Sequence, residues 1–298
     1  MNCILVTGAS GYVGRQCLSH LHELGFEVHG IAREPQPASG VVMHGADILR
    51  GSDWRSLLNE LRPSHLLHLA WTTAHGAFWT DPANGTWLES SRGLVDAFIE
   101  AGGRRIVTAG SCAEYDWSAP PPFSESLTPC EPSTPYGRAK LALYEHAAAR
   151  CAAAGLSHAH ARLFFSFGPD EQAGRLVPAV ILSLAAGREF EIKDAGALRD
   201  FLDVREIGRA LALIAAGDST GPINIGMGVG VTVGDLAGQI ARLMDRPSLL
   251  RLQNSGAVSE IVADTRRLNL DVGFENRVPL AAGLADAVQW WRERNFAP

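Results

Sequence analysis

Three side chains have the residue types and the spacing of an acid–base centre. Tyr136 and Lys140 stand four residues apart in "PYGRAK", and a helix places such a pair on one face. A free tyrosine has a pKa of about 10, and a nearby ammonium group stabilises the phenolate and lowers that pKa. Ser111 ends the apolar run "RRIVTAGS" and offers a hydroxyl to the same reacting oxygen. Such a trio could give a proton to a carbonyl oxygen as hydride arrives, or take one from a hydroxyl as hydride leaves.

A glycine-rich turn near the start of the chain indicates where a hydride carrier would bind. "TGASGYVG" places Gly8, Gly11 and Gly14 directly after the apolar run "CILV" and before an amphipathic segment. Glycines let the backbone approach a pyrophosphate closely, and the start of the following helix favours negative charge. We interpret this as a dinucleotide-binding turn; the alternative is a glycine-rich turn without a ligand.

The end of the second predicted strand favours NADP(H) over NAD(H). Turns of this kind hold the ribose of NAD with an acidic residue about 20 positions beyond the glycines, but here Ala32 stands at that place and Arg33 follows it. A guanidinium group suits a 2′-phosphate, and Arg15 could supply a second cation. Glu34 keeps NAD(H) possible, because it could take the role of the missing acid. The alternative for Arg33 is a solvated loop charge.

Short apolar runs alternate with amphipathic segments over the first half of the chain and predict an α/β fold. The βαβαβ rhythm implies a Rossmann-type, doubly wound parallel sheet with right-handed crossovers. Past about residue 168 the rhythm changes, and we expect a smaller C-terminal α/β substrate domain in which Thr232 caps a helix. The predicted strands are 3–10 (a range that includes the glycine turn after the strand), 27–33, 65–70, 104–111, 199–204 and 223–228. The predicted helices are 12–25, 54–63, 87–103, 135–156, 174–187 and 232–244.

The two expected domains interleave along the chain. The NADP(H)-binding domain covers 1–168 and about 199–228, and the substrate domain covers 169–198 and about 229–298. Asp47 follows a predicted third strand and could accept a hydrogen bond from the adenine amino group. The segment 117–135 is rich in proline, which predicts an ordered but irregular loop beside the site.

Bulk properties argue against several function classes. The chain has 298 residues, 46% of them hydrophobic, and a formal net charge of −6, which disfavours a nucleic-acid binder. No apolar run reaches the roughly 18 residues of a membrane span, and the N-terminus lacks the basic region of a signal peptide. The five cysteines form no CxxC pair, so free thiols in a reducing cytoplasm are the simplest interpretation, and no metal site is expected.

Several motifs together resemble the extended short-chain dehydrogenases/reductases, a family of nucleotide-sugar epimerases, 4,6-dehydratases and 4-keto reductases. They are the glycine turn at 7–14, Asp47, "HLA" at 68–70, Ser111, the Tyr136–Lys140 pair, "GP" at 168–169 and "RDFLDV" at 199–204. The resemblance spans almost the full chain. It implies a bound nicotinamide dinucleotide, a substrate domain that closes over a nucleotide-linked sugar, and a homodimer through helices at about 86–101 and 136–154.

The resemblance also implies roles for particular residues. Ser111, Tyr136 and Lys140 would be catalytic, and both Tyr136 and Lys140 would contact the cofactor. The other cofactor contacts would come from Gly8, Ser10, Gly11, Tyr12, Val13, Arg15, Arg33, Asp47, Ile48, Leu69, Ala70 and Phe164. Substrate contacts would come from Trp71, Cys112, Ala113, Phe165, Arg175 and Arg199.

A departure from the family's motifs argues against a dehydratase. The 4,6-dehydratases resemble one another in a Thr-Asp-Glu triplet, and this chain has Ser111, Cys112 and Ala113 at those positions. The acid and base that remove water are therefore absent. Glu114 comes one residue late and, on a strand-like stretch, would point to the opposite face.

Other departures concern the sugar pocket. An asparagine of many epimerases is Phe165 here, which favours a deoxysugar. Trp71 stands where small residues are more usual, so we expect the substrate mouth to be narrowed or apolar. Arg199 aligns with an arginine that holds the substrate diphosphate in relatives. Its alternative is a structural salt bridge to Asp200 or Asp203.

These features predict NADPH-dependent reduction of the C4 keto group of a nucleotide-activated 6-deoxysugar. The alternatives are a nucleotide-sugar epimerase with tightly bound NAD, a reductase of a small ketone or aldehyde, and a non-catalytic dinucleotide-sensing protein. The sugar, the nucleotide base and the stereochemistry at C4 depend on loops 71–90 and 117–135 and on the C-terminal domain.

Overall fold

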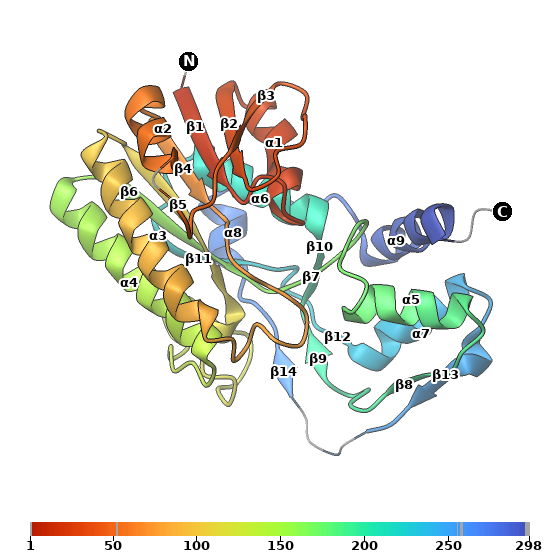
Figure 1. Ribbon diagram of the computed structural model, residues 1–298. Coiled ribbons are helices and arrows are strands. Elements are labelled where there is room, and N and C mark those ends of the chain that lie inside the picture. Colours follow the sequence, from red (N-terminus) through yellow and green to blue (C-terminus); the bar gives the residue numbers. More distant parts are fainter. Residues whose placement is uncertain (1, 52, 255, 257–258, 296–298) are drawn as a thin grey trace.

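A seven-stranded parallel sheet forms the larger of two lobes in the computed structural model, which describes residues 2–51, 53–254, 256 and 259–295 (Figure 1). The strand order is β11-β6-β5-β4-β1-β2-β3. Because the chain winds outward from β1 in one direction and then from β4 in the other, the predicted doubly wound Rossmann-type sheet is confirmed. The strands are β1 (Asn2–Thr7), β2 (Phe26–Ala32), β3 (Val41–Gly45), β4 (His65–His68), β5 (Arg105–Ser111), β6 (Ser157–Leu163) and β11 (Gly221–Ile225).

Helices cover both faces of this sheet. α1 (Gly14–Glu23) and α6 (Val204–Ala216) bury their apolar sides against one face. α2 (Asp53–Leu61), α3 (Ala83–Glu100) and α4 (Pro135–Ala154) cover the other face. A parallel sheet covered on both sides needs strands that are buried throughout, and all seven residues of β5 are buried.

The smaller lobe has its own hydrophobic core, formed by three helices and short strands (Figure 1). The helices are α5 (Leu176–Ala185), α7 (Val233–Leu243) and α9 (Leu280–Asn295), and β8 (Phe190–Ile192) pairs with β13 (Leu250–Leu252). The predicted cap of α7 is confirmed, because the Thr232 hydroxyl accepts a hydrogen bond from the Asp235 amide at 3.0 Å.

Short strand pairs connect the two lobes. β7 (Phe165–Phe167) pairs with β10 (Phe201–Asp203), and β9 (Leu198–Arg199) lies between β12 (Val231–Thr232) and β14 (Glu260–Ile261). The remaining short elements are the 3₁₀ turns η1 (Cys112–Glu114) and η2 (Pro247–Leu249) and the helix α8 (Arg266–Leu270).

Some elements differ from the sequence prediction. α3 begins at Ala83 rather than at 87, because the Asp81 carboxylate accepts a hydrogen bond from the Ala83 amide and so starts the helix earlier. β6, α6 and α9 were not predicted at all. Leu268 and Phe274 belong to the range expected for the substrate domain, yet they pack in the core of the main sheet.

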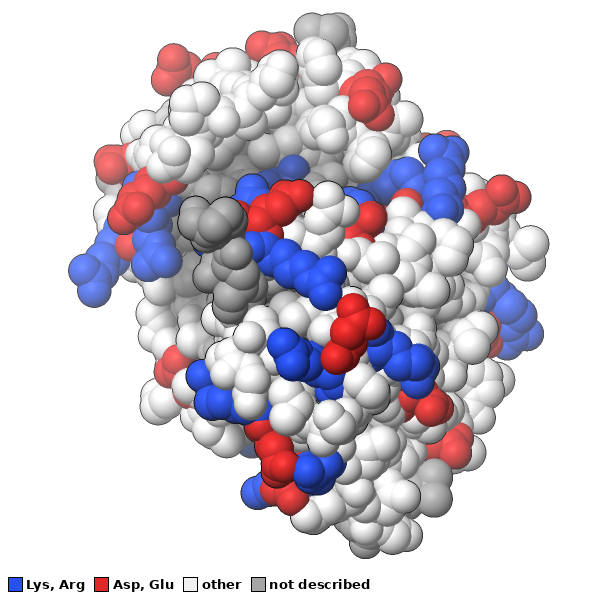
Figure 2. Space-filling model, turned by 90° about the vertical axis from the view of Figure 1, so that its right-hand side faces the viewer, with Lys and Arg blue, Asp and Glu red and all other residues white. Residues whose placement is uncertain are grey.

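The surface carries charges of both signs. On the face shown in Figure 2, lysine and arginine side chains are interspersed with aspartate and glutamate. Among the described residues, no helix combines the length and the apolar character needed to cross a membrane.

Candidate active site

A cavity of about 430 Å³ opens between the lobes at the carboxyl ends of β1, β4 and β5. In sheets of this order ligands bind where the winding direction reverses, which here is between β1 and β4. The cavity brings together most of the residues that the sequence singled out. Those that line it are Gly8, Gly11, Tyr12, Val13, Leu69, Ala70, Trp71, Ser111, Cys112, Tyr136, Lys140, Phe164, Phe165, Arg175 and Arg199.

The glycine turn at the floor of this cavity has no room for side chains. Gly8 has a φ of +69°, and a Cβ on Gly14 would lie 2.1 Å from the Gly8 carbonyl oxygen. Glycine alone therefore lets the start of α1 close onto the turn. The bare backbone at a helix start makes a cradle that fits the pyrophosphate of a dinucleotide.

Tyr136 enters the cavity from the first turn of α4. The Thr134 hydroxyl accepts a hydrogen bond from the Gly137 amide and Pro135 follows at the first helical position, which fixes where the helix begins. The Tyr136 side chain is buried and meets the Phe78 ring edge-on, with 4.9 Å between ring centroids. Burial raises the pKa of Tyr136, and the Ser111 side chain opposes that rise.

Lys140 lies one helical turn beyond Tyr136 and is 3% exposed. Its ammonium group donates to the Ala109 carbonyl oxygen at 3.0 Å and lies 4.0 Å from the centroid of the Trp71 ring. Its distance to the centroid of the Tyr136 ring is 5.8 Å. Burial lowers the pKa of Lys140 to about 7, although the Glu114 carboxylate opposes this.

Ser111 ends β5 at the edge of the cavity and begins the turn η1. Its hydroxyl accepts a hydrogen bond from the Ala113 amide at 3.2 Å, and the Glu114 carboxylate accepts one from the Ser111 amide at 2.8 Å. This reciprocal pair is a capping box. The stretch is therefore a helical turn and not strand-like, which corrects the reason given for the orientation of Glu114.

Glu114 lies outside the residues that line the cavity and is buried beneath it. Its carboxylate bonds to the His160 ring at 3.0 Å and accepts from the Arg162 guanidinium at 2.8 Å. Burial alone would raise the pKa of Glu114, but His160 and Arg162 outweigh burial and lower it to about 2. Glu114 is thus an ionised, fully bonded support of the turn that carries Ser111.

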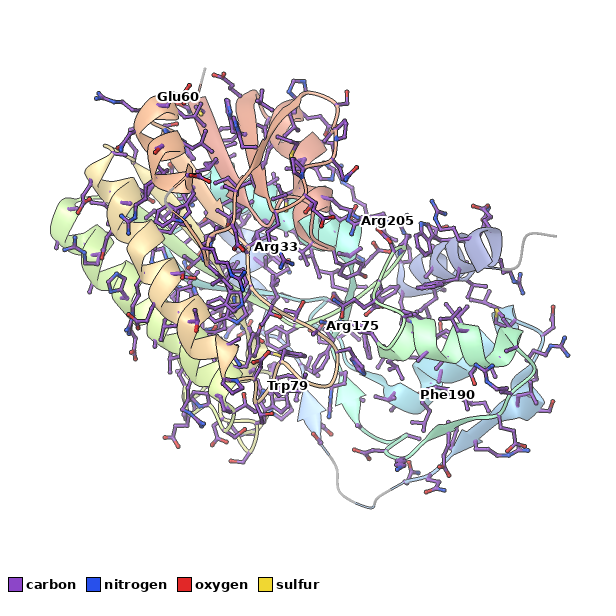
Figure 3. All side chains as sticks on the ribbon, in the orientation of Figure 1. Arg33, Glu60, Trp79, Arg175, Phe190 and Arg205 are labelled. Carbon is purple, nitrogen blue, oxygen red and sulfur yellow. The ribbon has the colours of Figure 1, made fainter. Side chains whose placement is uncertain are left out.

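Both predicted cofactor arginines are absent from the residues that line the cavity. Arg15 forms an ion pair with Asp170, a partner that the sequence did not indicate. Arg33 is exposed just after the end of β2, on the larger lobe in Figure 3.

Four more predicted residues also lie outside the cavity lining. Ser10 is exposed, Ile48 is buried in the core under α2, and Ala113 packs beside Tyr136 and Phe78. Asp47 accepts a hydrogen bond from the Leu49 amide at 2.9 Å. These positions follow from local turns and packing that the motif pattern alone does not specify.

The predicted substrate arginines both reach the cavity. Arg199 donates to the backbone carbonyls of Leu198 and Ser259, each at 2.8 Å. The suggested partners of Arg199 are bonded elsewhere: Asp203 pairs with Arg205, and Asp200 accepts backbone amides such as that of Gly228.

Arg175 lies near the meeting point of the two lobes, as does Trp79 (Figure 3). It donates to the Thr73 carbonyl oxygen at 3.4 Å. Its guanidinium carbon is 5.9 Å from the centroid of the Phe78 ring.

Sequence reasoning missed much of the cavity wall. The added lining residues that matter most for its chemistry are Thr73, His75, Phe78, Trp79, Glu171 and Phe201. Phe78 and Trp79 come from the loop between β4 and α3, and Glu171 comes from the segment before α5. A single sequence gives little indication of where loop residues lie, because loops have no periodic pattern. The adjacent aromatic residues Phe78 and Trp79 in "AFWTD" were nevertheless a hint that this loop contributes to the pocket.

Comparison with known proteins defines the class. The family model "NAD dependent epimerase/dehydratase family" matches residues 4–226, and the chain belongs to this family. It is an NAD(P)-dependent enzyme of the extended short-chain dehydrogenase/reductase type.

Individual relatives cover almost the whole chain. The UDP-glucose 4-epimerase of Rhizobium meliloti (strain 1021) is 26% identical, over 99% of this chain and 98% of the relative. A dTDP-4-dehydro-6-deoxy-D-allose reductase of Streptomyces sp is also 26% identical, over 97% of this chain and 96% of the relative. Among solved structures, MoeE5 in complex with UDP-glucuronic acid and NAD is 30% identical, with a TM-score of 0.85, over 98% of this chain and 99% of that one.

Proposed function

We propose that this protein catalyses the NADPH-dependent reduction of the C4 keto group of a nucleotide-activated 6-deoxysugar. The observation that carries the proposal is the aromatic surround of Tyr136. Trp71, Phe78 and Trp79 all contact its ring, with centroid distances of 6.5, 4.9 and 5.7 Å. These aromatic rings suit the side of a sugar that has a methyl group in place of a hydroxymethyl group. A sugar packed against them would have its keto group close to the Tyr136 phenol.

The proposed chemistry divides among three side chains. The nicotinamide, when bound, supplies hydride to C4. Tyr136 gives its proton to the oxygen that becomes a hydroxyl, and Ser111 holds that oxygen by a hydrogen bond. Lys140 keeps a positive charge near the phenol and holds the nicotinamide ribose.

The absence of an acid at the end of β2 supports NADPH as the reductant. Ala32 occupies the last position of that strand and exposed Arg33 follows it. An arginine there can pair with a 2′-phosphate. NAD(H) remains the alternative, and MoeE5, whose structure contains NAD, supports that alternative.

The residues around the reacting centre support a reductase more than a dehydratase. Cys112 and Ala113 supply no acid or base, and burial raises the pKa of the Cys112 thiol to about 12. Phe165 replaces a polar sugar contact with an apolar ring. The similarity to a dTDP-4-dehydro-6-deoxy-D-allose reductase supports the same substrate class.

A nucleotide-sugar epimerase is the second candidate, because the relatives include UDP-glucose 4-epimerases. An epimerase returns its hydride to the same sugar and keeps its dinucleotide bound. A small ketone or aldehyde reductase is a third candidate, since fold and catalytic trio do not fix the substrate.

Turnover with a panel of substrates tests the proposal. Purified protein is mixed with NADPH or NADH and several UDP- and dTDP-linked 4-keto-6-deoxysugars, and absorbance loss is followed. The proposal is supported if at least one sugar causes NADPH oxidation and if the Tyr136→Phe variant lowers the rate of that oxidation at least a hundredfold. Tightly retained NAD⁺, interconversion of UDP-glucose and UDP-galactose, and no net NADPH oxidation would establish the epimerase instead.

We also propose that the active protein is a cytoplasmic homodimer that pairs through α3 and α4. The two helices lie side by side on one face of the sheet. Light scattering of the purified protein should give twice the mass of one chain, and a monomer would contradict the dimer.

A further inference from the structure

Glu171 is an acidic side chain in the cavity wall to which the proposed chemistry gives no role. It lies between β7 and α5, where the chain passes from the main sheet into the smaller lobe. The residue is 5% exposed and lines the cavity. Its Oε2 atom is buried and has no hydrogen-bond partner within the described part of the chain.

Two polar groups that also line the cavity, those of Tyr12 and Arg175, make no described hydrogen bond to this carboxyl. The phenol oxygen of Tyr12 is also buried without a hydrogen-bond partner among the residues described. Arg175 is close enough that its positive charge lowers the pKa of Glu171, yet the described contacts contain no ion pair between them. A carboxyl and a guanidinium therefore line the same cavity, and the described contacts contain no ion pair between them.

Arg175 connects this corner of the cavity to the reacting centre. Its guanidinium lies against Phe78, whose ring meets Tyr136 edge-on. A sugar held with one edge at the Tyr136 phenol would thus extend toward Arg175 and Glu171.

An unsatisfied buried carboxyl is costly, because nearly all buried polar groups in folded proteins have partners. Burial raises the pKa of Glu171 to about 8, with Arg175 opposing that rise. A ligand in the cavity that donates a hydrogen bond to this carboxyl would remove the cost once the side chain turns Oε2 toward it.

We propose that Glu171 is a specificity-determining residue that accepts a hydrogen bond from a hydroxyl group of the bound sugar. The inference rests on the proposed nucleotide-sugar substrate class. The partner is a neutral hydroxyl and not an ammonium group, because a second cation beside Arg175 would be repelled in a buried place.

Binding of stable nucleotide sugars tests this without relying on turnover. Affinities of UDP-glucose, dTDP-glucose, UDP, dTDP and NADP⁺ are measured by calorimetry for wild type, Glu171→Leu and Glu171→Gln. Glu171→Leu should weaken the better nucleotide sugar about tenfold, as expected for one lost hydrogen bond to a buried acceptor. The nucleoside diphosphates and NADP⁺ should change less than about twofold. Glu171→Gln keeps an acceptor oxygen and should restore most of the affinity.

Glu189→Gln is the matched control, since Glu189 is an exposed carboxylate of the smaller lobe. It should bind every ligand like wild type. Equal weakening of nucleotide and nucleotide sugar, or weaker NADP⁺ binding, would overturn the inference. A Glu171→Gln protein as weak as Glu171→Leu would also overturn it, because charge would then be required.

Two further outcomes separate this inference from the proposed function. Wild-type binding of a nucleotide sugar with no effect of Glu171→Leu overturns the inference alone. Failure of the wild type to bind either nucleotide sugar overturns the inference as well, whereas the proposed function stands or falls with the turnover assay. Should Glu171→Leu not fold, Glu171→Ala takes its place, and melting curves of each variant verify folding.

Discussion

The ammonium group of Lys140 lies 4.0 Å from the centroid of the Trp71 ring. A cation over an aromatic face is attracted by the ring, most strongly where water is excluded. Trp71 therefore supports the charged form of a lysine whose burial favours the neutral form. The same indole donates to the Asn84 side chain at 2.9 Å, which fixes the ring in place.

Replacing Trp71 by leucine should shift the pH dependence of turnover. Loss of the ring attraction, about 0.5–2 kcal/mol, destabilises the ammonium form and lowers the pKa of Lys140 further. The alkaline limb of kcat/KM should move about 0.5–1.5 pH units toward lower pH. Trp71→Phe keeps an aromatic face and should move it less. An unchanged profile in Trp71→Leu would show that the ring does not influence the lysine.

Lys140→Met should change how stability depends on pH. The folded pKa of about 7 lies below the unfolded value of about 10.4, so between these values the unfolded chain binds a proton that the folded protein lacks. Stability from this group therefore rises with pH across that window. The free energy of unfolding is measured with urea at pH 7 and at pH 9.5. Between these pH values, the wild type should gain on the order of 2–3 kcal/mol more than Lys140→Met. Parallel changes in both proteins would contradict the buried lysine.

Glu114→Gln should destabilise the protein by about 3 kcal/mol or more, because it leaves Arg162 buried without its carboxylate. The folded pKa of about 2 lies below the unfolded value near 4.3. The stabilisation by Glu114 is thus present above about pH 4 and is lost as pH falls toward 2. Glu131→Gln, at an exposed site, is the control and should match wild type. Equal melting temperatures of Glu114→Gln and wild type would refute the role of this network.

Arg33→Ala should weaken NADPH binding about tenfold to hundredfold and leave NADH binding unchanged, since only NADPH carries a 2′-phosphate. Arg15→Ala should have the smaller effect, because Asp170 already holds that guanidinium. Fluorescence titration of both cofactors measures this, with the exposed Arg242→Ala as control. Equal loss for NADPH and NADH would remove Arg33 as the discriminating residue.

Local patterns were enough to single out Ser111, Tyr136, Lys140 and the glycine turn, all of which line the cavity. Apolar runs indicate buried strands, and ligands bind at the edge of the sheet where parallel strands end. Gly8 and Ser111 directly follow or end such runs, so the sequence alone predicts that they lie at this edge. The spacing of Tyr136 and Lys140 likewise fixes their helix face. These positions depend on neighbours within a few residues.

Contacts between distant segments could not be predicted in the same way. Arg15 pairs with Asp170 across the fold, and a single sequence does not indicate that partner. Glu171 faces the cavity only because the chain crosses between lobes at that point. Glu114 is different, because "SCAE" already has the Ser-x-x-Glu spacing of a capping box and could have predicted the turn.

The chain's late return to the main sheet affects how the protein folds. One face of that sheet is covered by α6, and Ile223 and Leu268 from still later in the sequence complete the same core. A ribosome-bound chain that ends before residue 204 has α1 on that face but exposes the apolar area that α6 covers in the complete fold. A fragment cut before α6 would lack this cover and would be prone to aggregate.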